Sequence, residues 1–95
     1  MSDGNDLADR SAVIGSLRAM LRRLADDLGT DASGLGEDDI IPDSGVLDSA
    51  GVIEFVMIID THYDLGLEAE DMTIDTLGSL TAIANLIVAR RAAGA

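Results

Sequence analysis

Apolar residues recur at intervals of three and four along three segments of this chain, and this periodicity restricts the fold more than any other feature. The apolar positions are Val13, Ile14, Leu17, Met20, Leu21, Leu24 and Leu28 in the first segment, Val52, Phe55, Val56, Ile59 and Tyr63 in the second, and Leu80, Ile83, Ala84, Leu86 and Ile87 in the third. Such spacing places the side chains along one face of an α-helix. Phe55 and Tyr63 are the only aromatic residues, so the core must be aliphatic. This favours a small all-α bundle over a sheet sandwich.

Capping and turn residues set the limits of the first two helices. Ser11 is the expected N-cap of the first helix, and Gly29 is its expected stop. The second helix is expected to begin at Ser49. Between them, residues 30–48 have no sustained period and form a long loop, which is unusual unless the loop has a function or contains a short turn of its own. Apolar residues that would attach this loop to the core are Leu35, Ile40, Ile41, Val46 and Leu47.

The second half of the chain carries similar signals. Residues 64–66, Asp-Leu-Gly, are expected to close the second helix. Thr73 would cap one short helical turn over residues 74–78, and Ser79 would cap the last helix. The expected fold is therefore a four-helix bundle of three main helices and one short helix, with the long loop between helices 1 and 2. Residues 9–91 form the single domain, between a flexible segment 1–8 and a flexible tail 92–95.

The charge is strongly negative and unevenly distributed. The chain carries 18 acidic and 6 basic residues, for a formal net charge of -12, and residues 24–89 contain no Lys or Arg. Such a field repels nucleic acids and anionic membranes and attracts proteins with basic surfaces. The N-terminal residues lack the pattern of a signal peptide, and the longest apolar run, 52–59, is too short to span a bilayer. We therefore expect a cytoplasmic monomer without nucleic-acid or membrane partners.

Known catalytic and metal-binding patterns do not fit the sequence. The single histidine, His62, has no Cys or second His with which to bind zinc. The acidic run that begins at Asp60 has Leu65 where a calcium loop requires Gly. Leu47 stands where the nucleophile elbow of a hydrolase requires Gly. We expect neither a metal site nor catalytic residues, and hence no enzyme.

One polar pair does point to chemistry. Ser49 follows Asp48 at the expected start of the second helix. There its hydroxyl would be exposed at the positive end of the helix dipole, which suits a phosphate ester. The alternative interpretation is that Ser49 serves only as the N-cap of this helix.

The arrangement around this pair resembles the acyl and peptidyl carrier protein family. The residues that carry the resemblance are the Asp48-Ser49 pair with Val46-Leu47 before it, the helix VIEFVMIIDTHYD after it, and the closing segment EDMTIDTLGSLTAIANLIV. It covers roughly residues 10–91 and implies the four-helix carrier-protein fold. It also implies that Ser49 carries 4'-phosphopantetheine, whose thiol holds acyl or aminoacyl groups as thioesters. By the same resemblance, Asp48 helps a phosphopantetheinyl transferase to recognise the site and to place a metal ion.

The residues after Ser49 differ from those of many fatty-acid and polyketide carriers. Those carriers have Leu directly after the serine, whereas this chain has Ala50 and then Gly51. Leu-Asp-Ser-x-Gly looks more like free-standing D-alanyl carriers and carriers loaded by adenylating enzymes. The resemblance therefore favours an aminoacyl cargo over an acyl cargo, in natural-product assembly of polyketides or nonribosomal peptides. The implied partners are an adenylating enzyme or acyltransferase and a downstream synthase or transferase.

The second helix supplies the expected docking surface for these partners. Ile53 and Met57 fall outside its apolar stripe and would form a small apolar patch beside Ala50, unless a third helix covers them. Glu54 and Asp60 would steer Arg- or Lys-rich enzymes towards it. The competing hypothesis is an acidic helical interaction module without a prosthetic group. Such a module would tolerate Ser49→Ala but not charge reversal at Glu54 and Asp60.

Overall fold

A computed structural model describes residues 2–94, and every regular element within them is a helix. The three long helices are α1 (Ser2–Leu28), α3 (Ser49–Tyr63) and α5 (Leu80–Gly94). The short ones are α2 (Ile41–Ser44), the 3-10 helix η1 (Ala69–Asp71) and α4 (Ile74–Leu77). The prediction of a small all-α bundle with three main helices and one short helix before the last is confirmed. No helix within residues 2–94 has both the length and the apolar character needed to cross a membrane.

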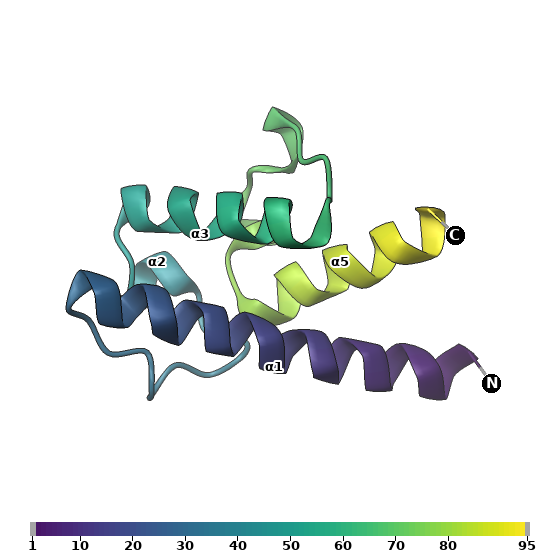
Figure 1. Ribbon diagram of the computed structural model, residues 1–95, viewed down its shortest axis with the longest axis horizontal. Coiled ribbons are helices and arrows are strands. Elements are labelled where there is room, and N and C mark those ends of the chain that lie inside the picture. The colour runs from purple at the N-terminus through teal and green to yellow at the C-terminus, as the bar shows by residue number, and fades with distance from the viewer. Residues whose placement is uncertain (1, 95) are drawn as a thin grey trace.

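The long helix α1 forms the base of the molecule (Figure 1). It packs against both α5 and α3, while α4 lies against α5 and α2 lies against α3. On the surface, the guanidinium Nη1 of Arg10 in α1 donates a 2.9 Å hydrogen bond to Oδ1 of Asn85 in α5. Figure 1 also shows the start of α3 near the end of α1, at one end of the bundle.

The core between these helices is aliphatic, with Phe55 as its one aromatic side chain among the buried residues. Its largest fully buried members are Phe55, Leu17, Leu21, Ile41, Leu47, Ile59, Leu80, Ile83 and Ile87. The periodicity predicts these positions on α1, α3 and α5 correctly. It is wrong at Leu28, which has the spacing of the apolar stripe but is 48% exposed. Leu28 is the last residue of α1 and lines an open surface depression beside the start of α3. Tyr63 is only half-buried.

The long loop between α1 and α3 is attached to the bundle at several points. Arg18 in α1 donates a hydrogen bond of 2.6 Å to the carbonyl of Leu35, and Thr30 donates one of 2.8 Å to the carbonyl of Val46. Buried apolar residues of the loop are Ala32, Leu35, Ile41, Val46 and Leu47. The loop is thus packed against the core along its length, and its last residues position the start of α3.

The loop also contains helix α2, which the sequence pattern does not predict as a helix. Pro42 lies in its first turn, where the missing N–H costs nothing. Gly45 follows it with φ of 81°, a left-handed conformation that L side chains rarely adopt. The backbone N–H of Ile41 donates to the carbonyl of Gly78 at 2.7 Å, which links the loop to the end of α4.

The ends of the long helices differ from the expected limits. Helix α1 begins at Ser2, so the N-cap expected at Ser11 is wrong: Ser11 lies inside the helix. Helix α5 extends to Gly94, beyond the expected domain limit at residue 91. Once a helix exists, each further residue adds one hydrogen bond, so a helix can continue without an apolar stripe. The flexibility expected of residues 1–8 and 92–95 stays a prediction, and residues 1 and 95 lie outside the described residues.

Other turn predictions are confirmed. Gly29 has φ of 80° directly after α1, and Asp64 ends α3 in the left-handed region with φ of 52°. The hydroxyl of Thr73 accepts a 3.2 Å hydrogen bond from the N–H of Thr76 at the start of α4. The hydroxyl of Ser79 accepts one of 3.1 Å from the N–H of Ala82 at the start of α5.

Two arginines near the end of α5 hold the connection between α3 and α4. The Arg90 guanidinium donates to the carbonyl of Leu65 at 2.8 Å and to Oδ2 of Asp71 at 2.9 Å. The N–H of Glu68 also donates to Asp71, and this hydrogen bond, followed by that from Arg90, lowers the pKa of the Asp71 carboxyl below its ordinary value of 3.8. Arg91 lies over the ring of Tyr63 at 5.4 Å from its centroid.

Candidate functional site

Helix α3 begins with a side-chain cap that Asp48 provides. Its backbone is extended, with φ of -81° and ψ of -175°, and its Oδ1 accepts a 2.8 Å hydrogen bond from the N–H of Gly51. The N–H of Val52 donates to the carbonyl of Asp48 at 2.9 Å. Ser49 is therefore the first residue within the helix, and the alternative interpretation of Ser49 as the N-cap is wrong.

This division of roles leaves the Ser49 hydroxyl free. The Ser49 side chain is exposed, and its hydroxyl forms no hydrogen bond with the side chains of residues 10–91 or with the described backbone. The N–H groups of Ser49 and Ala50 belong to the first turn of a 15-residue helix and have no acceptor there. An anion on the Ser49 oxygen would therefore face unpaired N–H donors and the positive end of the helix dipole. The exposed hydroxyl fits a phosphate ester.

Buried residues before and after Ser49 hold the first turn of α3 against the core. Leu47 is 2% exposed and Val46 is 7% exposed, so the chain is anchored in the core immediately before Asp48. Gly51 is buried, and a Cβ on it would lie 3.2 Å from Leu47 and 3.3 Å from Oδ1 of Asp48. A glycine at position 51 thus allows the Leu47 anchor and the Asp48 cap to approach the helix together.

The expected docking residues of α3 lie on its outer surface. Ile53 is 54% exposed and Met57 is 62% exposed, and Glu54 between them is also exposed. No helix within residues 2–94 covers them, so the alternative that a third helix does is wrong. Ser49, Ile53 and Met57 follow one another at intervals of four and form one exposed row. Residue 50, an exposed alanine, begins the neighbouring row.

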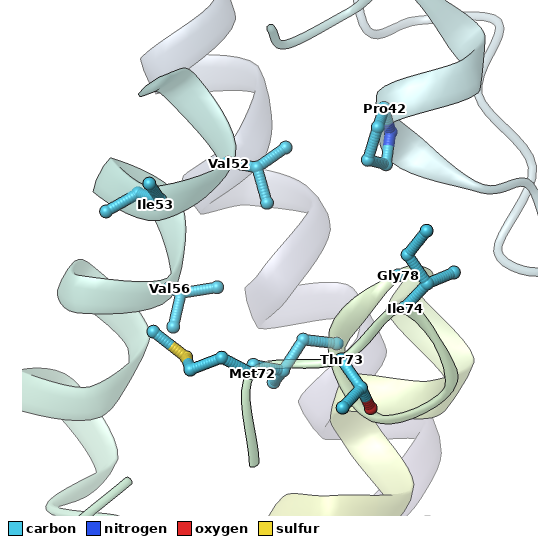
Figure 2. A pocket seen from close by; sticks show the side chains of 9 residues that line it. Pro42, Val52, Ile53, Val56, Met72, Thr73, Ile74 and Gly78 are labelled. Atoms are coloured by element: carbon cyan, nitrogen blue, oxygen red, sulfur yellow. The ribbon is translucent and has the colours of Figure 1, made fainter. Parts of the chain in front are cut away.

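Sequence reasoning missed Ile58, which is 39% exposed one helical turn after Glu54 and lines a depression between α3 and α1. The signal was present, since α3 contains more apolar residues than one core-facing stripe can bury. It also missed an apolar pocket of about 160 Å³ between α3, α2 and α4 (Figure 2). The side chains of Val52, Val56, Met72 and Ile74 surround this pocket, and Pro42 closes one side (Figure 2). Met72 and Ile74 are 46% and 60% exposed at its rim.

Asp60, the remaining expected docking residue, is not part of the Ser49 surface. It lies eleven residues further along α3, roughly 16 Å of helix rise from Ser49. It is half-buried, and its Oδ1 accepts hydrogen bonds from the N–H groups of Gly66 at 3.0 Å and Leu67 at 3.4 Å. Its charge is used within the chain to hold the turn after α3.

Possible metal ligands and bases near Ser49 are described by the structure for residues 10–91 only. In this range no three His, Asp or Glu side chains form a group that could hold a metal ion. His62 is exposed near the end of α3, and its ring packs edge-on against Tyr63 at 4.8 Å. No basic side chain forms a hydrogen bond with the Ser49 hydroxyl among the side chains of residues 10–91.

Comparison with known proteins agrees with this geometry. A family model described as a phosphopantetheine attachment site matches residues 18–84. This range runs from the middle of α1 into α5 and includes the Asp48-Ser49 turn. Searches of curated proteins and of solved structures returned no match. The matched domain is the kind to which 4'-phosphopantetheine is covalently attached, and the exposed hydroxyl and free N–H groups at the start of α3 fit such a phosphodiester. The family match covers most of the chain, which therefore belongs to the phosphopantetheine attachment-site family, in agreement with an acyl or peptidyl carrier protein.

Proposed function

We propose that this chain is a carrier protein in which the Ser49 hydroxyl holds 4'-phosphopantetheine as a phosphodiester. The thiol at the end of this arm holds an aminoacyl or acyl group as a thioester and delivers it between enzymes of a biosynthetic pathway, in natural-product assembly. The chain acts on no substrate itself and is instead the substrate of its partners. We also propose that it is a cytoplasmic protein. The net charge of -12 supports a monomer that binds neither nucleic acid nor anionic membranes.

One observation carries this proposal: the cap of α3 comes from Asp48, and so the Ser49 hydroxyl is free and exposed. A serine that capped the helix would direct its oxygen at a backbone N–H and would be a poor acceptor for a new group. The nearest serine along the chain provides the contrast. The hydroxyl of Ser44 donates to the carbonyl of Ile41 and accepts from the N–H of Val46. Among these two serines, only Ser49 offers an uncommitted oxygen.

The neighbours of Ser49 have proposed roles in recognition. Asp48 directly precedes Ser49 in the chain, and beyond its capping bond we assign it to recognition by the phosphopantetheinyl transferase. Ala50, Ile53, Glu54 and Met57 form the surface on which an adenylating enzyme or acyltransferase docks, and after it the downstream synthase or transferase. Ile53 and Met57 supply the apolar centre of a small transient interface, and Glu54 attracts basic partner side chains.

Loading with coenzyme A tests the proposed function. The unmodified chain is incubated with coenzyme A and a broad-range phosphopantetheinyl transferase, and its intact mass is measured. We expect the addition of one phosphopantetheine group to the wild type, none to Ser49→Ala, and one to the control variant Ser44→Ala. An unchanged wild-type mass with several transferases, or full loading of Ser49→Ala, would overturn the proposal.

The cargo requires a second assay with the loaded chain. The Ala50-Gly51 pair favours an aminoacyl group, so adenylating enzymes with a panel of amino acids are compared with acyltransferases and their acyl donors. We expect thioester formation with an adenylating enzyme. Loading by acyltransferases alone would replace the aminoacyl assignment with an acyl one and leave the carrier role intact.

A further inference from the structure

Ser49 stands on an exposed ridge of α3 between two depressions. The ridge is the row of Ser49, Ile53 and Met57. On one side lies the apolar pocket of Figure 2, which reaches α4. On the other side lies an open groove of about 430 Å³ between the end of α1 and the start of α3. Its lining includes Leu28, Thr30, Gly45, Ala50, Gly51 and Glu54, and we call it the α1–α3 groove.

Small residues keep the α1–α3 groove open directly beside Ser49. Ala50 contributes one methyl group to its lining, and Gly51 contributes none. Gly45 forms part of the opposite lining, where nothing lies within 4 Å of the position that a Cβ would take. A larger side chain at position 50 would project into this space. The small residue at position 50, where many fatty-acid carriers have Leu, therefore leaves the groove open.

The chemistry of the groove is mixed. Leu28 is 48% exposed in its lining, so about half of this apolar side chain faces solvent, which is unfavourable. The buried side chains of Val46 and Leu47 also contribute to the lining. Glu54 is exposed one helical turn beyond Ala50 and makes no ion pair with any side chain of residues 10–91. An occupant with an apolar group near Ser49 and an N–H donor further away would match these features.

We propose, on the basis of the proposed function, that the α1–α3 groove is the resting site of the prosthetic arm attached to Ser49. Beyond its phosphate, 4'-phosphopantetheine carries two methyl groups on one carbon, then a hydroxyl and two amides. Leu28 and Ala50 offer apolar contact for the methyl groups, and the Glu54 carboxylate is an acceptor for an amide N–H. The two chain neighbours of Ser49, Asp48 and Ala50, both line the groove, whereas neither lines the apolar pocket.

Contacts between the arm and the chain can be measured by NMR. The isotope-labelled chain is loaded with an unlabelled arm, and the mass of the loaded chain is checked first. An isotope-filtered NOE spectrum then reports protein protons close to the two methyl groups of the arm. We expect cross peaks to the methyl groups of Leu28 and Thr30, which lie on a different segment from Ser49. Peaks to Ala50 alone carry no weight, because that residue is adjacent to the attachment point.

Three variants sharpen this test. Ala50→Leu fills the groove and should remove the cross peaks to Leu28 and Thr30. Leu28→Gln removes its apolar edge and should weaken or remove the peak to Thr30. The control, Ile74→Gln, changes a similarly exposed residue at the rim of the other pocket and should leave both peaks intact.

The outcomes separate this inference from the function on which it rests. Cross peaks to Met72 and Ile74 instead would place the arm in the apolar pocket and overturn the inference. A loaded chain without peaks beyond Ala50 would show a free arm and overturn it as well, while the carrier function would stand. A chain whose mass does not change on loading would overturn both.

Discussion

Replacing Asp48 with Ala should destabilise the fold, because Asp48 caps α3. The variant loses the 2.8 Å hydrogen bond between Oδ1 and the N–H of Gly51. Loss of an N-cap costs about 1 kcal/mol, and the lost interaction of a carboxylate with the helix dipole costs about 0.3–1 kcal/mol at an exposed position. For a domain of 95 residues, each 1 kcal/mol corresponds to a fall in Tm of about 4–8 °C.

Two further variants separate the cap from the charge and from the serine. Asp48→Asn keeps an oxygen for the Gly51 N–H and should lose only the dipole contribution of about 0.3–1 kcal/mol. Ser49→Ala removes a hydroxyl without a hydrogen-bond partner, so its free energy of unfolding should stay within about 0.5 kcal/mol of wild type. Urea unfolding and thermal unfolding, both followed by circular dichroism, provide the values.

The pattern across these three variants decides between two capping schemes. A loss of about 1 kcal/mol in Ser49→Ala, with Asp48→Ala unchanged, would mean that Ser49 caps α3. That result would refute the claim that the Ser49 hydroxyl is free of a capping hydrogen bond, which is the main structural support for the attachment site.

Two other predictions concern stability. Gly78→Ala should lower the free energy of unfolding by about 1–3 kcal/mol, because the new Cβ would clash with the carbonyl oxygen of Ile74. The control Gly15→Ala lies in an exposed part of α1 with open space around the new Cβ, and it should raise the free energy of unfolding by about 0.5–1 kcal/mol. Equal effects of the two substitutions would contradict this packing. Asp71 has a lowered pKa in the folded state, so its contribution is present above pH 3.8 and is lost as the pH falls through the folded pKa. Asp71→Asn should therefore flatten the acid side of the curve of unfolding free energy against pH, which is measured by urea unfolding at a series of pH values. Arg90→Gln should flatten this curve less, because the hydrogen bond from the Glu68 N–H to Asp71 remains. A curve that is unchanged in Asp71→Asn would contradict the lowered pKa of Asp71.

The long helices and the core could be predicted from the sequence, because burial of one apolar face follows directly from the spacing. Leu17, Leu21, Ile59 and Ile83 are all buried as the pattern requires. The pattern fails at the last residue of α1, where the side chain borders an open surface groove. Leu28 has the right spacing for the core, but the spacing contains no information about where the packed surface ends.

The candidate site could be found from the sequence, but its internal roles could not. Asp48 and Ser49 are adjacent and are both favourable N-caps, so propensity alone does not separate them. The structure separates them because Leu47 is buried and Gly51 allows the Asp48 carboxylate to reach its N–H. Asp60 shows the same limit, since its hydrogen bonds to Gly66 and Leu67 depend on how the chain turns after α3.

The open grooves beside Ser49 are also beyond the sequence pattern. The α1–α3 groove joins the end of α1, the long loop and the first turn of α3, which lie apart in the chain. Short-range periodicity describes single helices, whereas such a surface depends on how the segments pack against one another. Only its small residues, Ala50 and Gly51, are visible in the sequence as a departure from a familiar motif.

The central claim is that the oxygen of Ser49 carries the prosthetic group, and locating that group at residue level tests it most directly. The wild-type chain is loaded with coenzyme A and a phosphopantetheinyl transferase, digested, and analysed by tandem mass spectrometry of the peptide that spans Ser44 and Ser49. The account predicts the whole added mass on Ser49 and none on Ser44. The same mass on Ser44, or on any residue other than Ser49, would contradict it.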